Sequence, residues 1–70
     1  MTEKKVFYLN GEKYFIKKNI CLFDVVCYFN FNTSLFILEY NNTVYRKEKW
    51  LSTFIINNDK IEVITIVGGG

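Results

Sequence analysis

Histidine, proline, alanine and glutamine are absent from this chain of 70 residues, and it has only two cysteines, Cys21 and Cys27. A zinc site needs about four Cys, His or acidic ligands, or three plus water, so no metal site is expected. Without histidine there is also no candidate nucleophile–base pair of the kind that activates Ser or Cys in enzymes. These absences argue against a metalloprotein and against an enzyme.

Long hydrophobic runs and a strong charge of one sign are also missing. The apolar runs are a few residues long, far below the roughly 20 residues of a membrane-spanning helix. Residues 1–5 lack the apolar region of a secretory signal. The net charge of +2 is spread along the chain, whereas nucleic-acid-binding surfaces carry dense basic patches. We therefore expect a soluble, intracellular protein that has neither a membrane nor a nucleic acid as partner.

Apolar residues are plentiful instead. Half of the chain is hydrophobic and 19% is aromatic, which favours one small folded domain over a disordered chain. Asparagine, isoleucine, lysine, phenylalanine and tyrosine are frequent, and their codons are rich in A and T. This bias leads to the hypothesis of an AT-rich genome, and hence of a protein in the plastid stroma (chloroplast) or in a bacterial cytoplasm.

The first half of the chain begins with a hairpin pattern. Residues 5–9 and 12–17 are rich in β-branched, aromatic and aliphatic residues, and Asn10-Gly11 between them is typical of a type I′ turn. A two-residue turn pairs Phe7 with Tyr14, and paired residues share one side of a sheet. The predicted core side of the hairpin comprises Phe7, Leu9, Tyr14 and Ile16.

Residues 22–29 change to the periodicity of an amphipathic helix. Its apolar stripe comprises Leu22, Val25, Val26 and Phe29. Cys21 occupies the predicted N-cap, an unusual residue there, and Asp24 suits the positive end of the helix dipole. The six-residue spacing places the two thiols on different faces, so no disulfide is expected. We expect Cys27 to be a buried free thiol that behaves as a small hydrophobe.

The second half of the chain reads mainly as strands and turns. Trp50 is expected to close the edge of the core, as a large aromatic side chain with one polar atom often does. The remaining predictions, in order, are a strand at 35–40, a turn at Asn41-Asn42, a short strand at 43–45, a charged surface segment at 46–49, an ambiguous stretch at 51–56, a turn at 57–59 and a strand at 60–67.

This order of elements predicts an α+β fold with one main helix packed on a mixed sheet. A ubiquitin-like β-grasp roll fits both the order and the length. Three of the four glycines follow the last predicted strand, as Gly68-Gly69-Gly70. Because glycine has high backbone entropy and no side chain to bury, we expect a ubiquitin-like domain at residues 1–66 and a flexible C-terminal tail at residues 67–70.

Several short motifs together resemble the ThiS/MoaD family of sulfur carriers, and within it the ThiS branch. The motifs are Asn10-Gly11-Glu12, Asp24-Val25-Val26, Glu39-Tyr40-Asn41, Trp50 and the terminal run from Asn58 to Gly70. The terminal run is the most specific of them. Cys21 and Asn42 depart from the family pattern at the helix cap and in the central turn, where they concern stability rather than the terminus.

The resemblance implies a carrier in thiamine biosynthesis rather than an enzyme. The Gly70 carboxylate would be adenylated by a ThiF-type, E1-like adenylyltransferase that uses ATP and Mg²⁺. Sulfur from a persulfide enzyme would then give a C-terminal thiocarboxylate, which a ThiG-type thiazole synthase consumes. No cofactor would be bound by the chain itself. Val67, Gly68 and Gly69 would thread into the partner active sites, where side chains would clash.

Docking is expected to need a surface as well as a tail. If Ile61 and Val63 face inward, then Glu62, Ile64 and Ile66 face outward, and exposed apolar side chains commonly mark partner sites. The alternative is that a loop or another part of the sheet covers them. Glu62, Ile64 and Ile66 are therefore the candidate partner-docking patch.

Three other functions fit parts of the sequence. A MoaD-like small subunit of molybdopterin synthase would use the same terminal thiocarboxylate, but a Pro-free ending at residues 66–70 favours ThiS. A ubiquitin-like modifier would share the activation step and end in an isopeptide bond. A small β module for single-stranded nucleic acid would stack bases on Tyr8, Phe15 and Tyr28, although the low net charge argues against it.

Overall fold

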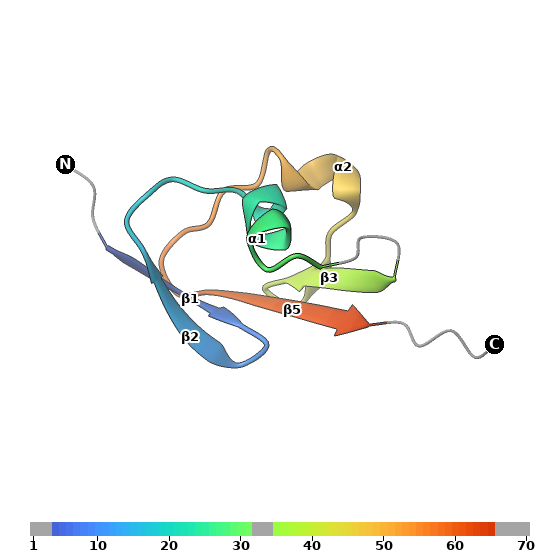
Figure 1. Ribbon diagram of the computed structural model, residues 1–70, viewed down its shortest axis with the longest axis horizontal. Coiled ribbons are helices and arrows are strands. Elements are labelled where there is room, and N and C mark those ends of the chain that lie inside the picture. Colours follow the sequence, from blue (N-terminus) through green and yellow to red (C-terminus); the bar gives the residue numbers. More distant parts are fainter. Residues whose placement is uncertain (1–3, 32–34, 66–70) are drawn as a thin grey trace.

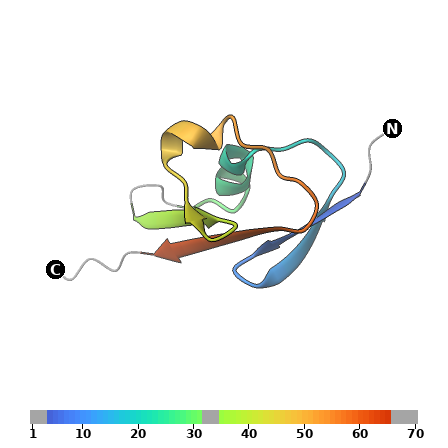
Figure 2. The same cartoon turned by 180° about the vertical axis from the view of Figure 1, so that it is seen from behind.

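The computed structural model describes residues 4–31 and 35–65 of the chain. The elements in chain order are β1 (Lys5–Leu9), β2 (Glu12–Ile16), α1 (Leu22–Tyr28), β3 (Phe36–Tyr40), β4 (Thr43–Val44), α2 (Lys47–Trp50) and β5 (Asp59–Thr65). Figure 1 shows both helices on one side of the strands, and the reverse view in Figure 2 shows the same separation. The predicted α+β arrangement, with a main helix on a mixed sheet, is confirmed.

The N-terminal hairpin has the predicted register. Phe7 lies opposite Tyr14, and Leu9 opposite Glu12. Asn10 and Gly11 both have positive φ, at 51° and 84°, as a type I′ turn requires. Phe7 and Leu9 are buried, while Tyr14 and Ile16 pack against the core from its edge. The prediction of this face is confirmed.

The sheet places the last strand in its middle. The strand order is β2-β1-β5-β3-β4, with β5 parallel to β1 and antiparallel to β3. A parallel neighbour requires a crossover, and here two connections cross the same face of the sheet (Figure 1), one with α1 between β2 and β3 and one with α2 between β4 and β5. The chain therefore reaches its C-terminal residues from the centre of the sheet.

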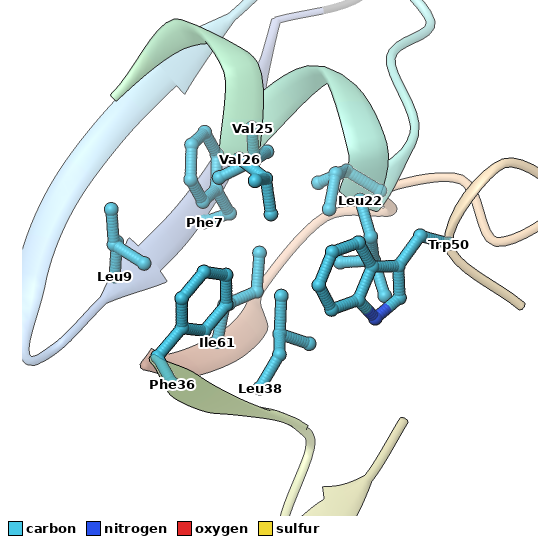
Figure 3. Close-up of a cluster of buried hydrophobic side chains, with 10 residues drawn as sticks. Phe7, Leu9, Leu22, Val25, Val26, Phe36, Leu38, Trp50 and Ile61 are labelled. Atoms are coloured by element: carbon cyan, nitrogen blue, oxygen red, sulfur yellow. The ribbon is translucent and has the colours of Figure 1, made fainter. Parts of the chain in front are cut away.

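The core lies between this sheet and the helices (Figure 3). Leu22, Val25 and Val26 of α1 are buried, and they meet side chains of the three central strands. Trp50 is 3% exposed, stacks on Phe36 with ring centroids 5.8 Å apart, and donates its indole N–H to the Tyr45 carbonyl at 3.0 Å. The expected role of Trp50 at the core is confirmed.

The cysteines differ from expectation in one respect. Both thiols are free, but Cys27 is exposed and Cys21 is the buried one. Residues in a helix are about 100° apart around the axis, so Cys27 lies on the side opposite the apolar stripe, whereas Cys21 lies at the edge of that stripe. The prediction of a buried Cys27 was wrong because the packing face is set by the stripe rather than by the residue type.

The segment that follows β4 is more ordered than the sequence indicates. Residues predicted as a charged surface stretch form the single turn α2, with Lys47, Glu48 and Lys49 exposed and Trp50 turned inward. One turn is too short to produce a helical periodicity. The ambiguous stretch after it contributes Ile55, which is fully buried, and is tied to the start of α1 by the bond from the Leu22 N–H to the Thr53 carbonyl at 2.9 Å.

Candidate functional site

The strand β5 alternates between the core and the opposite face of the sheet. Ile61 is 1% exposed and Val63 packs against the core. Glu62 is exposed, and Ile64 is 45% exposed. The predicted facing of these four residues is confirmed. The other residues of the predicted site, Ile66, Val67, Gly68, Gly69 and Gly70, lie outside the described residues.

The neighbouring strand β3 adds two residues to this outward face. Ile37 lies directly opposite Ile64, and Glu39 directly opposite Glu62. Residues that face each other across antiparallel strands have Cβ atoms about 4.5–5.5 Å apart. Ile37 is 38% exposed and Glu39 is half-buried. We call Ile37, Glu39, Glu62 and Ile64 the outer patch.

The sequence alone did not place Ile37 and Glu39 in this patch. Phe36 and Leu38 are buried, and the strict alternation of a strand then turns Ile37 and Glu39 outward. That signal was present in residues 36–40. What was missing was the register with β5, which depends on contacts between distant parts of the chain.

The outer patch is apolar at one end and acidic at the other. Two like charges directly opposite each other in a sheet are unfavourable by a few tenths of a kcal/mol or more. Lys60, two residues before Glu62 on the same strand, is exposed on the same face. A cationic group of a partner, placed between the carboxylates of Glu39 and Glu62, would offset the repulsion between them.

The beginning of β5 is held by a buried carboxylate. Asp59 is 3% exposed and accepts hydrogen bonds from the Tyr40 hydroxyl, from Asn41 Nδ2 at 3.1 Å and from the Ile56 N–H at 2.7 Å. Burial, and then the hydrogen bond to Asp59, raises the pKa of Tyr40 well above its ordinary value. Asp59 was predicted only as a turn residue, because Tyr40 and Asn41, at the end of β3, are distant from it in the sequence.

Asparagine side chains extend the hydrogen bonding of the sheet beyond the ends of its strands. Asn10 Oδ1 accepts from the Val63 N–H at 2.8 Å, and Asn41 Oδ1 accepts from the Lys60 N–H at 2.8 Å. Asn57 Oδ1 accepts from the Val6 N–H, also at 2.8 Å. These amides satisfy backbone groups where no strand residue is available. Asn10, next to β1, and Asn41, next to β3, thus hold β5 from both sides between Lys60 and Val63.

The described residues hold little that could perform chemistry. Within residues 4–31 and 35–65, no three His, Cys, Asp or Glu side chains come together in a way that could hold a metal ion. No helix in the same ranges is long and apolar enough to cross a membrane. One small hollow, of about 250 Å³, adjoins the outer patch and is lined in part by Tyr8, Lys60 and Glu62. This hollow extends the outer patch toward β1 and the Asn10-Gly11 turn.

The fold has a close counterpart among solved structures. The crystal structure of the thiamine biosynthesis protein ThiS from Geobacter metallireducens superimposes with a TM-score of 0.79, covering 93% of this chain and 99% of that one at 18% sequence identity. This likeness confirms the predicted β-grasp fold.

Three relatives share more of the sequence, and each has the name uncharacterized protein ycf40. The protein from Trieres chinensis is 52% identical over 70 residues, covering 100% of this chain and 96% of the relative. Those from Porphyra purpurea and Pyropia yezoensis are 37% and 39% identical over 62 residues, covering 89% of this chain and 87% of each relative. The model of the ThiS family matches residues 7–70, and the chain therefore belongs to the ThiS family.

Proposed function

We propose that this protein is a sulfur carrier of thiamine biosynthesis, and that its Gly70 carboxylate carries the sulfur. The observation that carries the proposal is the family match, which extends through the final glycines to residue 70. The fold and the absence of histidine from the whole chain agree with a protein that is the substrate of other enzymes. In this proposal the chain is a substrate and carrier, and its partners supply the catalytic groups.

Three steps would load the sulfur. First, an oxygen of the Gly70 carboxylate attacks the α-phosphorus of ATP, and pyrophosphate leaves with Mg²⁺, which yields an acyl-adenylate. Second, the outer sulfur of a partner's persulfide attacks the acyl carbon, and AMP leaves. Third, a thiol attacks the partner's sulfur in the acyl disulfide, so that a new disulfide forms between the thiol and the partner and the thiocarboxylate leaves. A ThiG-type thiazole synthase would receive that sulfur, and ATP and Mg²⁺ would be held by the ThiF-type enzyme.

The residue types at the terminus suit this route. Gly68, Gly69 and Gly70 have no Cβ, so their backbone can pass through an active site too narrow for side chains. The backbone groups of such a segment can also bond to a partner groove. Val67, in this proposal, is the last residue with a side chain before the reacting group.

The outer patch supplies the docking surface in this proposal. Ile64 is six residues before Gly70, so an extended chain from the patch reaches at most about 20 Å. A ThiF-type enzyme that contacts Ile37 and Ile64 with apolar groups and Glu62 with a cation would bring its nucleotide site within that reach. Ile66, two residues beyond Ile64, is proposed to extend the same contact.

The proposed location is the plastid stroma. The ycf designation of the three relatives belongs to genes of plastid genomes and agrees with the A- and T-rich codon bias inferred from the composition. A bacterial cytoplasm remains the alternative location. Identifying the genome that carries the gene would decide between the two locations.

ATP–pyrophosphate exchange tests the activation step. The full chain, with a ThiF-type enzyme, ATP and Mg²⁺, should support exchange, whereas a chain that lacks Gly70 should fold and give none. A chain that lacks residues 1–3 is the matched control and should exchange normally. Exchange by the chain without Gly70 would refute the proposed role of its carboxylate.

The fate of the activated chain separates the pathways. If a large subunit of molybdopterin synthase consumed the thiocarboxylate and thiazole synthase did not, the protein would be a MoaD-like subunit. If lysine conjugates accumulated, it would be a ubiquitin-like modifier.

A further inference from the structure

A second surface lies far from the outer patch in the sheet, between β2 and α1. A hollow of about 480 Å³ opens there. Its apolar lining includes Tyr14, Ile16, Ile20, Val25 and Phe29. Val25 is buried, and the other four are partly buried at the edge of the core, so a ligand with apolar side chains would fit the hollow.

The strand beside this hollow has an open edge. Among the described strands, β2 stands at the end of the order and pairs only with β1. In a two-residue hairpin the closing pair, Leu9 and Glu12, exchanges both backbone hydrogen bonds, and alternate pairs follow. The N–H and C=O groups of Lys13 and Phe15 therefore point away from β1. They are available to another strand.

Aromatic side chains flank the same edge. Phe15 is 56% exposed and Tyr28, on the last turn of α1, is 82% exposed. Both line the hollow. Rings of this size on an open edge are costly to leave in water and are enriched in partner contacts.

The charges around the hollow select the kind of partner. Lys17 and Lys18, at the end of β2, line it, and Lys13 and Lys4 lie over the Phe15 ring at 5.8 and 4.7 Å. The one acid of the lining, Asp24, accepts the Cys21 N–H at 2.9 Å. A second copy of this edge would bring lysines against lysines, whereas acidic residues would be attracted.

We propose that the β2–α1 groove binds an extended segment of a partner protein, which adds a strand to β2. Alternate apolar side chains of that segment enter the hollow, and its acidic residues meet Lys17 and Lys18 at one end. This site is distinct from the proposed sulfur chemistry and needs neither the outer patch nor Gly70.

Two synthetic peptides test the site. Each alternates isoleucine with threonine over about seven residues, with two glutamates at the N-terminus of one peptide and at the C-terminus of the other. Titration into the ¹⁵N-labelled full chain should shift the amide signals of Lys13, Phe15 and Tyr28 with one of them. Slower hydrogen exchange of the Lys13 and Phe15 amides would indicate strand addition specifically. Because the glutamates should lie near Lys17 and Lys18, the peptide that binds better would show whether the added strand is parallel or antiparallel to β2.

Charge reversal provides the matched comparison. The double variant Lys17→Glu, Lys18→Glu should bind the preferred peptide about tenfold more weakly. Lys47→Glu, Lys60→Glu changes the net charge equally at exposed sites outside the groove and should bind as the wild type does. Tyr28→Ser should weaken binding several-fold without changing the unfolding midpoint.

Three results would overturn the proposal. The first is that neither peptide shifts any groove amide at millimolar concentration. The second is that the shifts fall on Ile37 and Ile64 instead. Concentration-dependent shifts of Lys13 and Phe15 without peptide would mean that the groove holds a second copy of the chain.

Discussion

The two ends of β5 serve different purposes. At its beginning, Asp59 is buried and accepts three hydrogen bonds, two of them from the distant residues Tyr40 and Asn41. Toward its end, Glu62 and Ile64 face outward opposite Glu39 and Ile37. The first end secures the register of the strand, and the second presents a surface. Substitutions at the first end should therefore act on stability, and those at the second on partner binding.

The largest effect is expected at Asp59. Asp59→Ala removes the acceptor of Asn41 Nδ2 and the Ile56 N–H and the nearer acceptor of the Tyr40 hydroxyl, and should lower the free energy of unfolding by about 3 kcal/mol. Urea denaturation followed by Trp50 fluorescence measures it. Glu62→Ala removes an exposed acid from the same strand and should change the free energy by less than about 0.5 kcal/mol. Equal losses of unfolding free energy for the two variants would show that the two ends of β5 do not differ in their contribution to stability.

The next largest effect is expected at Ile64 and concerns binding. Ile64→Thr keeps a β-branched side chain but removes apolar area, so the KM for this chain in pyrophosphate exchange should rise about tenfold. The control is Ile56→Thr, because Ile56 is 61% exposed outside the outer patch. An unchanged KM for Ile64→Thr, or an equal rise for Ile56→Thr, would exclude the patch from docking.

The pH dependence of the free energy of unfolding tests the role of Tyr40 at the beginning of β5. The pKa of Tyr40 is raised in the folded chain. The contribution of the protonated Tyr40 hydroxyl to the free energy of unfolding is therefore complete below about pH 10, and it is lost as the pH rises through the folded pKa. The free energy of unfolding should fall above pH 10, and less steeply in Tyr40→Phe. Tyr14, whose pKa burial and Glu12 also raise, should leave a residual slope. Identical slopes in both proteins would contradict the role of Tyr40.

The smallest effect is expected at the paired carboxylates. Glu62→Gln relieves the repulsion from Glu39 and should raise the free energy of unfolding by about 0.3 kcal/mol. The same change should slow association with the ThiF-type enzyme most at low salt, since exposed charges are screened at high salt. Glu48→Gln, on α2, should not stabilise the chain. A Glu62→Gln variant that is less stable than the wild type would show that the two carboxylates are not in conflict.

The local parts of the fold could be predicted from the sequence. Asn10-Gly11 sets the hairpin register because the turn length alone decides which residues face each other. The stripe from Leu22 to Phe29 identifies α1 and its buried side. The alternation around Glu62 identifies the outward residues of β5 in the same way.

Other features depend on contacts between distant segments, and the sequence could not supply them. Asp59 is an anchor only because Tyr40 and Asn41 lie beside it in the folded chain. Ile37 joins the outer patch through the β3–β5 register, and Asn10 contributes a side-chain acceptor to a strand 53 residues away. Each of these pairs is set by tertiary packing, which local patterns do not encode.

The mass of the C-terminal peptide tests the central claim most directly. The full chain is incubated with a ThiF-type enzyme, ATP, Mg²⁺ and a persulfide donor, and is then cleaved and analysed by mass spectrometry. The proposal predicts one sulfur-for-oxygen exchange that fragmentation places on Gly70, with no such exchange in the chain that lacks Gly70. Sulfur found on Cys21 or Cys27 instead, or an unmodified Gly70 after complete ATP turnover, would contradict it.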